Sequence, residues 1–574
     1  MALVKGRTPR VNDRPVVRRL PVGAEPLAGG GVHFRVWAPA RHRVGVVLEI
    51  PGTAPRVFQL GPESDGYFSG IVADAGAGTL YRYALDGDER PYPDPASRYQ
   101  PEGPHGPSQV IDPSLFRWTD PGWRGLKLDG QVIYELHVGA FTPEGTLEAA
   151  RAQLRELAAL GITVVELMPL SDFPGRFGWG YDGVDLFAPT RLYGEPDDLR
   201  RFVDSAHSIG MGVIVDVVYN HFGPDGNYLR AFSPYYFTDR YENEWGDAIN
   251  FDGEHSAPVR ELVAANAGYW VDEFHMDGLR LDATQQIFDS SEEHILTTIA
   301  RSARAAAGDR HVLLVAENEP EQVRLVKPVD EGGYGLDALW NDDFHHSARV
   351  AMTGHNEAYY SDYSGTPQEL ISAMKRGYLS QGQHYQWQGR PRGSSTRGIR
   401  PATFITFLQN HDQVANSAFG QRCDRLTSPG LYRAFTALTL LSPGTPLLFM
   451  GQEFAASSPF LFFADHNREL APLVAAGRKQ FLSQFPSIAT PEVQAMLPDP
   501  SDPETFGRCK LDLSERTSHG WAYALHRDLL RLRRGSRRSG RRSRVGARSR
   551  RGRRRPRGAA RPRPRGRTRG RRGR

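Results

Sequence analysis

Between residues 31 and 111 apolar and polar positions alternate in short runs such as GVHFRVWAP and YFSGIVAD, and Gly, Pro and Asp separate the runs. This period of two is typical of half-buried strands, and short strands joined by turn residues form antiparallel sandwiches. We therefore predict an N-terminal β-sandwich over residues 31–118, preceded by a flexible N-terminus over residues 1–30.

After residue 118 the pattern changes, because β-branched apolar runs now alternate with helical segments. One such segment, LEAARAQLRELAALG, has Leu and Ala at helical spacing and ends at Gly161. Alternation of this kind requires a parallel sheet, and eight strands in sequence favour a (β/α)8 barrel over residues 119–490. The predicted strands are Val132–Val138, Thr163–Met168, Gly212–Tyr219, Gly278–Ala283, Val312–Glu317, Leu336–Trp340, Phe404–Gln409 and Leu447–Gly451.

Residues 491–530 begin a further C-terminal region, and residues 531–574 follow it with 23 Arg and no Asp, Glu or Lys. From Arg533 onward the chain cannot bury enough apolar surface to offset its ordering entropy, so we predict a disordered tail. We interpret this tail as the out-of-frame translation of a GC-rich gene. The alternative is an arginine-rich arm that binds nucleic acid or another acidic surface.

The net charge of +5 depends on this tail, since the 530 residues before it hold 48 basic and 66 acidic side chains, a net charge of −18. An acidic body speaks against a nucleic-acid partner except through the tail. Two cysteines, Cys423 and Cys509, cannot form a disulfide framework. The basic, proline-broken start has no apolar signal core, and no run of 18 apolar residues occurs. We predict a cytoplasmic protein with no membrane partner; the oligomeric state stays open.

Several predicted strands end in charged side chains, and barrel active sites lie at the C-terminal strand ends. A single carboxylate at a strand end is most often structural, but four such ends converging on one barrel mouth favour a catalytic site. The residues concerned are Asp216 and His221 on the third strand, Arg280 and Asp282 on the fourth, Glu317 on the fifth, and His411 and Asp412 on the seventh.

Asp282 and Glu317 lie 35 residues apart, one strand-to-strand step, so they face each other at the mouth. Two facing carboxylates are what glycoside cleavage needs, one as nucleophile and one as acid. Arg280, on the same strand face as Asp282, can keep that carboxylate ionised. A metal site is the chemical competitor, but the two histidines neighbour different carboxylates on different strands. We therefore expect neither a metal nor another cofactor.

Aromatic residues add to this interpretation. The Gly-rich loop after the second strand carries Trp179 and Tyr181. Aromatic faces suit the apolar faces of sugar rings. We predict that Tyr181 is such a platform and that Trp179 packs the loop onto the barrel. His345 and His346, after the sixth strand, are interpreted as solvated loop residues.

The motifs DVVYNH (216–221), GLRLDAT (278–284), AENE (316–319) and QNHDQ (409–413) together resemble the α-amylase superfamily of retaining glycosidases and transglycosidases. The resemblance covers residues 30 to 525. It implies Asp282 as nucleophile, Glu317 as general acid/base and Asp412 as the stabiliser of the transition state. It also implies a set of substrate-binding residues around the attacked glucose: Tyr181, Asp216, His221, Arg280, His411 and Gln413.

Within the superfamily the N-terminal β domain resembles branching enzymes, debranching enzymes and malto-oligosyltrehalose trehalohydrolases. The stretches at 94–112, 451–470 and 497–513 are most similar to the last family. That resemblance implies hydrolysis of the α-1,4 bond next to a terminal trehalose. The loop after the eighth strand then supplies contacts to the trehalose from Phe462, Phe463, Asp465 and His466.

Two alternatives stay open. The first, within the same chemistry, is a glucan branching enzyme or another α-glucan-active member of the superfamily. The second is an inactive glycan-binding barrel or an RNA-associated protein. The superfamily also implies a closing C-terminal β domain, which the sequence after residue 525 does not offer, so we predict that this domain is missing.

Overall fold

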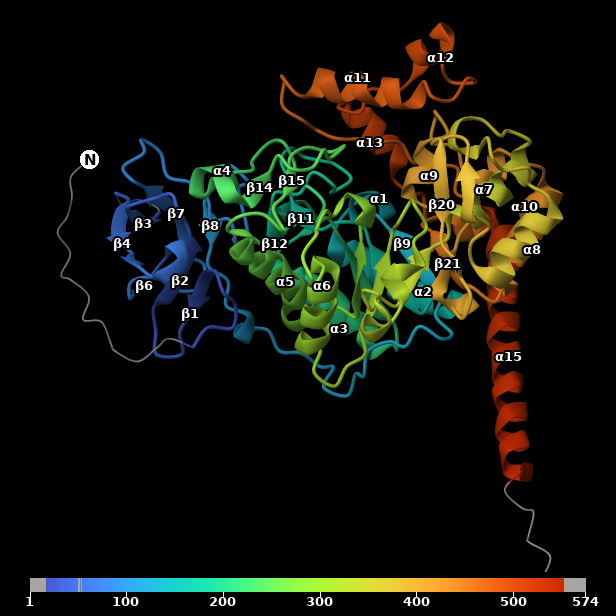
Figure 1. The fold of residues 1–574 in the computed structure, drawn as a ribbon, viewed down its shortest axis with the longest axis horizontal. Helices are drawn as coiled ribbons and strands as arrows, with labels where there is room; N and C mark the ends of the chain where they lie inside the picture. The colour runs from blue at the N-terminus through green and yellow to red at the C-terminus, as the bar shows by residue number, and fades with distance from the viewer. Residues whose placement is uncertain (1–16, 50–51, 53, 552–574) are drawn as a thin grey trace, which may run out of the picture.

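The computed structural model describes residues 17–49, 52 and 54–551. Figure 1 shows a β-sandwich beside a barrel, with α11 to α13 above the barrel and the long α15 extending from it. The predicted order of the first two domains is confirmed. The sandwich pairs a sheet of order β1-β2-β6-β5 with a sheet of order β4-β3-β7-β8. Its strands are β1 Gly23–Pro26, β2 Val32–Trp37, β3 Val44–Leu48, β4 Arg56–Gln59, β5 Gly61–Pro62, β6 Tyr67–Val72, β7 Leu80–Leu85 and β8 Ser108–Gln109.

The sandwich begins earlier than the sequence predicts. β1 pairs antiparallel with β2, with Gly23 opposite Arg35, inside the segment expected to be a flexible N-terminus. Arg18 ties this start down, because its guanidinium donates to the Gly23 carbonyl (2.8 Å) and to the His33 carbonyl (3.0 Å). Pro26 is compatible with β1 because the strand lies at the edge of its sheet. Residues 1–16 of that predicted segment lie outside the described residues.

All eight predicted barrel strands are present, and they close a parallel barrel in chain order. Each is fully buried, which explains why the sequence shows continuous apolar runs here and not alternation. The last strand starts at Thr445, two residues before its prediction, and includes Pro446. The strands are β9 Ile133–Leu136, β10 Val164–Leu167, β13 Gly212–Val217, β16 Gly278–Leu281, β17 Leu313–Ala316, β18 Ala338–Trp340, β21 Phe404–Thr406 and β22 Thr445–Phe449.

Helices connect these strands, and small two-stranded sheets extend the loops at the C-terminal ends. In α2 the predicted limits hold: the Thr146 side chain caps the first turn, and Gly161, at φ 130°, bonds back to the Leu157 carbonyl. The helices are α1 Val138–Phe141, α2 Leu147–Leu160, α3 Pro196–Ser208, α4 Leu229–Phe232, α5 Ser256–Glu273, α6 Ile295–Ala306, α7 Asp342–Thr353, α8 Pro367–Arg376, α9 His411–Ala415 and α10 Pro429–Leu441. The loop strands are β11 Ser171–Asp172, β12 Asp185–Pro189, β14 Phe237–Thr238, β15 Ala248–Ile249, β19 Gln381–Tyr385 and β20 Arg390–Gly393.

The sandwich packs against the helices that follow the third barrel strand. Tyr67 donates to Glu261 on α5 (2.7 Å), and the Trp37 ring meets Tyr236 edge-on at 5.0 Å. At the far end of α5 the buried Glu273 accepts from Arg200 on α3 (2.7 Å) and pairs with Arg19. One carboxylate thus joins the first residues of the sandwich to two barrel helices.

A buried histidine cluster lies at the N-terminal end of the barrel, opposite the mouth. His207 on α3 bonds through Nδ1 to Asp120 (2.7 Å) and through Nε2 to Asp277 (2.9 Å). The Trp123 ring stacks on His207 at 4.6 Å and its indole N–H donates to Asp277 (2.6 Å). Burial lowers the pKa of His207, but the two carboxylates outweigh burial and raise it above 6.5. A charged imidazolium therefore pins the segment that leads from the sandwich into β9.

We expect His207→Leu to lower the free energy of unfolding by about 3–5 kcal/mol at pH 6, because it leaves two buried carboxylates without their cation. The folded-state pKa of His207 is raised, so the stabilisation is fully present below pH 6.5 and is lost as pH rises through that raised value. Urea denaturation between pH 5.5 and pH 9 measures both effects. His311→Leu, at an exposed histidine on the same end of the barrel, is the control and should change stability by less than about 0.5 kcal/mol. Equal stability of both variants would contradict this role.

After β22 the described part of the chain contains helices and no strand. The helices are α11 Ala471–Leu482, α12 Pro491–Met496, α13 Pro503–Cys509, α14 Glu515–Ser518 and α15 Gly520–Arg551. The helical α15 differs from the disorder predicted from residue 531. Arg533 explains its first part, because its buried guanidinium donates to the carbonyls of Leu440 and Ser442. Further along, Arg is a good helix former. Residues 552–574 of the predicted tail lie outside the described residues.

Candidate active site

Arg280 is the centre of the cluster at the barrel mouth. Its Nη1 donates to Asp216 Oδ2 and to Asp282 Oδ1, both at 2.7 Å, and its Nη2 lies 2.9 Å from Glu317 Oε2. The guanidinium is fully buried and its Cζ lies 4.2 Å from the centre of the Trp340 ring. One cation therefore fixes three of the four carboxylates that the sequence predicts for this mouth, all except Asp412.

The parallel register explains how these side chains meet. Asp216 and Arg280 are direct neighbours on β13 and β16. Asp282 and Glu317 each follow the last residue of a strand, and their N–H groups continue the ladder to the carbonyls of Val217 (3.1 Å) and Leu281 (3.0 Å). Ala283 then turns through a left-handed conformation (φ 36°), and its N–H donates to Glu317 Oε2 (2.9 Å). Such backbone strain is costly and is most often found at functional sites.

Burial controls the protonation of the two carboxyl groups. It raises the pKa of Asp282 to about 6, against the opposing effect of Arg280 and with a smaller contribution from Asp216. It raises the pKa of Glu317 to about 7, again opposed by Arg280 and assisted by Asp282. The charge pairing predicted between Arg280 and Asp282 is present but does not prevail over burial. At pH 7 Asp282 is mainly ionised, and Glu317 is the group that holds a proton more readily.

His411 connects Asp412 to the rest of the cluster. Its Nδ1 bonds to Glu135 on β9, and its Nε2 lies 2.9 Å from Tyr181 Oη and 3.5 Å from Asp412 Oδ2. Burial lowers the pKa of His411, but Asp412 and Glu135 outweigh it and raise the pKa to about 9. The ring of Tyr181 stacks on His411 at 5.1 Å, and its hydroxyl donates to Asp216 (2.7 Å). Tyr181 is partly exposed, whereas Trp179 is buried against Phe460, so Trp179 packs the loop as expected.

The remaining predicted residues lie around this cluster at different distances from it. His221 is buried next to Asn220, whose amide donates to Asp282 Oδ2 (3.3 Å). Gln413 follows Asp412 directly and accepts from the Tyr360 hydroxyl (2.7 Å). Both residues therefore adjoin the carboxylates that the sequence predicts to be catalytic.

The loop after β22 contacts the loop after β10. Asp465 accepts from the backbone N–H and from Nε of Arg176, both at 2.9 Å, and His466 lies 3.4 Å from Asp182. These partners belong to the loop after β10 that carries Tyr181. Phe463 is fully buried and meets the His137 ring at 5.1 Å, so it caps the barrel, whereas Phe462 keeps a partly exposed ring.

Three features escaped the sequence analysis. Glu135 is a buried carboxylate inside the first predicted strand, and a charged residue within an apolar run is the signal that could have marked it. Trp245 is 57% exposed and its ring lies 6.2 Å from His221, where it offers an open aromatic face. The prediction that His345 and His346 are solvated is wrong, since both are buried. α7 begins directly after β18 and turns them into the protein.

The family models match two parts of the chain, a carbohydrate-binding module 48 (isoamylase N-terminal domain) over residues 21–105 and an alpha amylase catalytic domain over residues 111–246. Malto-oligosyltrehalose trehalohydrolase of Deinococcus radiodurans is 42% identical over 523 residues, 90% of this chain and 83% of the relative. The chain belongs to the malto-oligosyltrehalose trehalohydrolase family. Another member, from Saccharolobus solfataricus, is 40% identical over 451 residues, 78% of each chain.

The fold of this malto-oligosyltrehalose trehalohydrolase family member also matches a crystal structure of a putative alpha amylase from Salmonella typhimurium. The TM-score is 0.83 at 41% identity, over 90% of this chain and 86% of that one. The family is one of glycoside hydrolases with a catalytic barrel, which agrees with the paired carboxylates at the mouth. Within the described ranges, none of the helices is both long and apolar enough to cross a membrane, and the His, Cys, Asp and Glu side chains form no group of three suited to a metal ion.

Proposed function

We propose that the chain hydrolyses the α-1,4-glucosidic bond next to the terminal trehalose of malto-oligosyltrehalose, by a retaining double displacement. The observation that carries the proposal is the single guanidinium of Arg280 in contact with both Asp282 and Glu317, at a barrel mouth. Its support from relatives is the 42% identity to an enzyme named for this reaction. The substrate is a glucan, and neutral sugar hydroxyls suit a mouth lined by carboxylates, Tyr181 and His411.

In the first step Asp282, the more acidic of the pair, attacks the anomeric carbon while Glu317 gives its proton to the glycosidic oxygen of the departing trehalose. In the second step Glu317 takes a proton from water, and the hydroxide formed displaces Asp282 from the anomeric carbon. Asp412 and the positively charged His411 contact the hydroxyls of the attacked glucose, and Tyr181 stacks on its ring. We assign substrate binding to Asp216, His221 and Gln413 through their contacts with these groups. Asp465 and His466 contribute by holding the loop of Tyr181.

Incubation with maltopentaosyl-trehalose and, separately, with maltohexaose tests the function. We expect trehalose and maltopentaose from the first substrate and far slower cleavage of the second. A site that bonds particular hydroxyls leaves polar groups unpaired with the wrong ligand, which makes such discrimination large. New side branches on amylose, with the trehalose-capped substrate left intact, would instead establish a branching enzyme.

The anomeric configuration of the product tests the role of Asp282. If Asp282 forms a covalent intermediate, the anomeric centre is inverted twice, so the freed malto-oligosaccharide appears first as the α anomer. Retaining glycosidases also place the two carboxyl groups about 5–5.5 Å apart. Proton NMR within the first minute of reaction reports the anomer, before mutarotation mixes the two forms. Initial release of the β anomer would show that Asp282 activates water and is not the nucleophile.

The pH profile tests the division of labour between the two carboxyl groups. Activity needs Asp282 ionised and Glu317 protonated, so kcat/KM should rise as pH passes about 6 and fall as pH passes about 7. The optimum then lies between these values. Initial rates from pH 4.5 to 9, with tryptophan fluorescence as a check that the fold persists, give the profile. A rate that continues to rise up to pH 9 would exclude Glu317 as the acid.

A further inference from the structure

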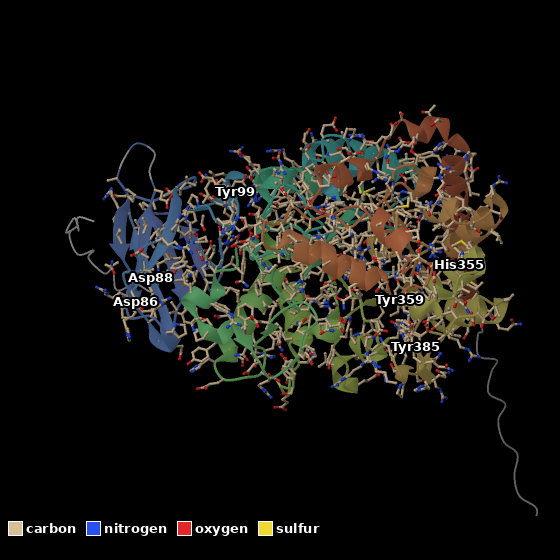
Figure 2. All side chains as sticks on the ribbon, turned by 90° about the horizontal axis from the view of Figure 1, so that it is seen from above. Asp86, Asp88, Tyr99, His355, Tyr359 and Tyr385 are labelled. Atoms are coloured by element: carbon tan, nitrogen blue, oxygen red, sulfur yellow. The ribbon has the colours of Figure 1, made fainter. Side chains whose placement is uncertain are left out.

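Helix α11 lies above the barrel (Figure 1), and its orange ribbon crosses the middle of the view from above (Figure 2). It is attached at a few points. Asn467, just before it, donates to Asp225 in the loop after β13 (3.0 Å). Ser487, just after it, donates its N–H to Glu357 beyond α7 (2.8 Å). Leu482 is the one residue of α11 that is fully buried.

Arg478 joins the middle of α11 to the residues behind Asp412. Its Nη1 donates to Asn416 Oδ1 (3.0 Å), and the Asn416 amide donates to the Tyr359 hydroxyl (3.2 Å). The Tyr359 hydroxyl in turn lies 3.3 Å from Gln413 Oε1. The guanidinium also sits 5.4 Å from the ring centre of Phe462. A chain of polar contacts therefore runs from α11 to the residue after Asp412.

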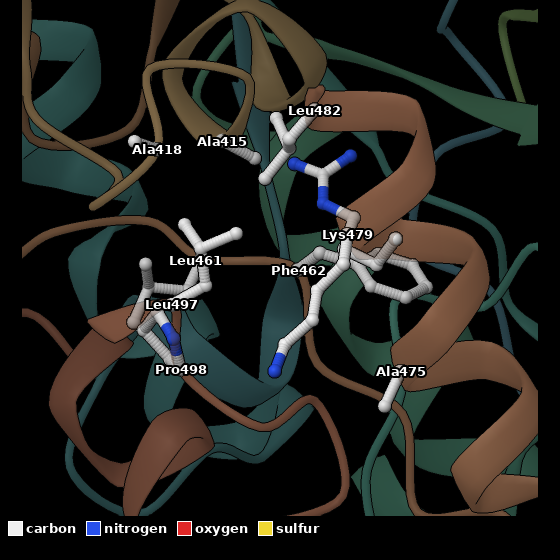
Figure 3. Close-up of a pocket in the computed structure, with 10 residues that line it drawn as sticks. Ala415, Ala418, Leu461, Phe462, Ala475, Lys479, Leu482, Leu497 and Pro498 are labelled. Atoms are coloured by element: carbon white, nitrogen blue, oxygen red, sulfur yellow. The ribbon is translucent and has the colours of Figure 1, made fainter. Parts of the chain in front are cut away.

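A small pocket of about 20 Å³, partly open to solvent, lies under this part of α11. Figure 3 shows Phe462 and Lys479 facing Leu461, Leu497 and Pro498 across it. Ala415, one turn after Asp412 on α9, forms part of the wall. The lining thus combines a partly exposed aromatic ring with two long cationic side chains, those of Arg478 and Lys479. These are the groups that receive a sugar, the ring against its C–H face and the cations as donors to its hydroxyls.

Aromatic rings connect the pocket to the attacked glucose. Trp179 lies 5.1 Å from Phe462 on one side, and 6.4 Å from Tyr181 and 5.2 Å from His411 on the other. Only the Trp179 ring therefore separates Phe462, in the pocket wall, from Tyr181, the platform proposed for the attacked glucose. A glucan chain that continues from that glucose reaches the pocket within a few units.

The order of the strands in the barrel indicates which part of the substrate lies near the pocket. Glu317 follows β17, and β9 is the strand opposite β17 in the barrel. α11 follows β22, which is next to β9, and its partner Asn416 follows β21. The leaving trehalose accepts its proton from Glu317 and so lies on the β17 side. The side of α11 is therefore left for the malto-oligosyl chain.

We infer that α11 and its pocket bind the malto-oligosyl chain beyond the attacked glucose, and that Arg478 sets the preference for long chains. The inference rests on the proposed hydrolysis. Substrates in which trehalose carries two glucose units end before the pocket, whereas those with six units reach it. Arg478 then stabilises only the complexes with long substrates.

The test compares kcat/KM for trehalose capped by six and by two glucose units, in the wild-type chain and in Arg478→Met. We expect the ratio of long to short substrate to fall about ten-fold, mainly through a higher KM for the long one, since a hydrogen bond from a charged donor is worth about this much. Arg478→Lys keeps the charge and should lose less. Arg468→Met, at an exposed arginine just before α11, is the matched control and should leave the ratio unchanged.

Lys479→Met is a second variant that does not depend on the packing of Arg478, because Lys479 is exposed. It should lower the same ratio about two- to three-fold, and circular dichroism checks the fold of each variant. An unchanged ratio in both Arg478→Met and Lys479→Met, with trehalose still released, overturns the inference and leaves the proposed function standing. A wild-type chain that releases no trehalose from either substrate overturns the proposed function instead.

Discussion

Asp282→Asn and Glu317→Gln are each expected to lower kcat for trehalose release at least about 100-fold. The first variant has a neutral amide in place of the carboxylate proposed to attack the anomeric carbon, and the second lacks the acidic proton proposed for the departing oxygen. Neither substitution changes the size of the side chain much, and both retain a polar partner for Arg280, so the fold should persist. Initial rates with maltopentaosyl-trehalose, alongside circular dichroism, provide the measurement.

Glu331→Gln is the control for this pair, because Glu331 is exposed and lies away from the mouth. It should leave kcat within a factor of two, which shows that loss of a carboxylate alone is harmless. A substrate with a good leaving group separates the two roles further, since it should rescue Glu317→Gln but not Asp282→Asn. Turnover like that of the wild-type chain in either active-site variant would remove that residue from the mechanism.

Arg280→Met is expected to lower the free energy of unfolding by about 3–5 kcal/mol at pH 7, because three carboxylates lose a common buried cation. Arg280 also lowers the pKa of both Asp282 and Glu317, so its loss raises these values further. Asp282 is then largely protonated at pH 7, and any residual activity should move to higher pH. Urea denaturation and a pH profile of the same variant measure the two effects.

Arg301→Met is the matched control. Arg301 forms an ion pair with Glu293, but both side chains are exposed, and an exposed pair contributes at most about 1 kcal/mol. Arg280→Lys should fall between the two, because it keeps the charge but cannot present two nitrogens to separate carboxylates. If Arg280→Met were as stable as Arg301→Met, the central place of this guanidinium would be refuted.

The fold of the first two domains could be predicted closely from the sequence, because each depends on a local pattern. Alternation with a period of two marks the sandwich, and fully buried strands read as apolar runs between helices. The pairing of Asp282 with Glu317 followed from the same logic, since consecutive strands of a parallel barrel end at one mouth. The strand β1 was missed because Pro21 precedes it and Pro26 ends it, and only its pairing with β2 reveals it.

The protonation of the carboxyl groups inside the mouth could be assigned only from the tertiary structure. The sequence places Arg280 next to Asp282, but a raised pKa depends on how much protein surrounds the carboxyl group, and burial comes from many distant segments. For the same reason the sequence does not show that His345 and His346 are buried, because their burial depends on how α7 packs. The sequence predicts that Asp465 and His466 contact the trehalose, and this stays a prediction. Their protein partners Arg176 and Asp182 lie almost 300 residues away in the chain, so no local signal shows these contacts.

The clustering of Asp216, Arg280, Asp282 and Glu317 could therefore be predicted, because these side chains lie at the ends of strands whose pattern is local. The contact of α11 with the residues that follow Asp412 could not be predicted. The pocket under α11 exists only because a helix that follows the eighth strand crosses back over the mouth and brings Arg478 to Asn416. Contacts between segments so far apart in the sequence depend on three-dimensional packing. No periodic pattern or motif in the sequence predicts them.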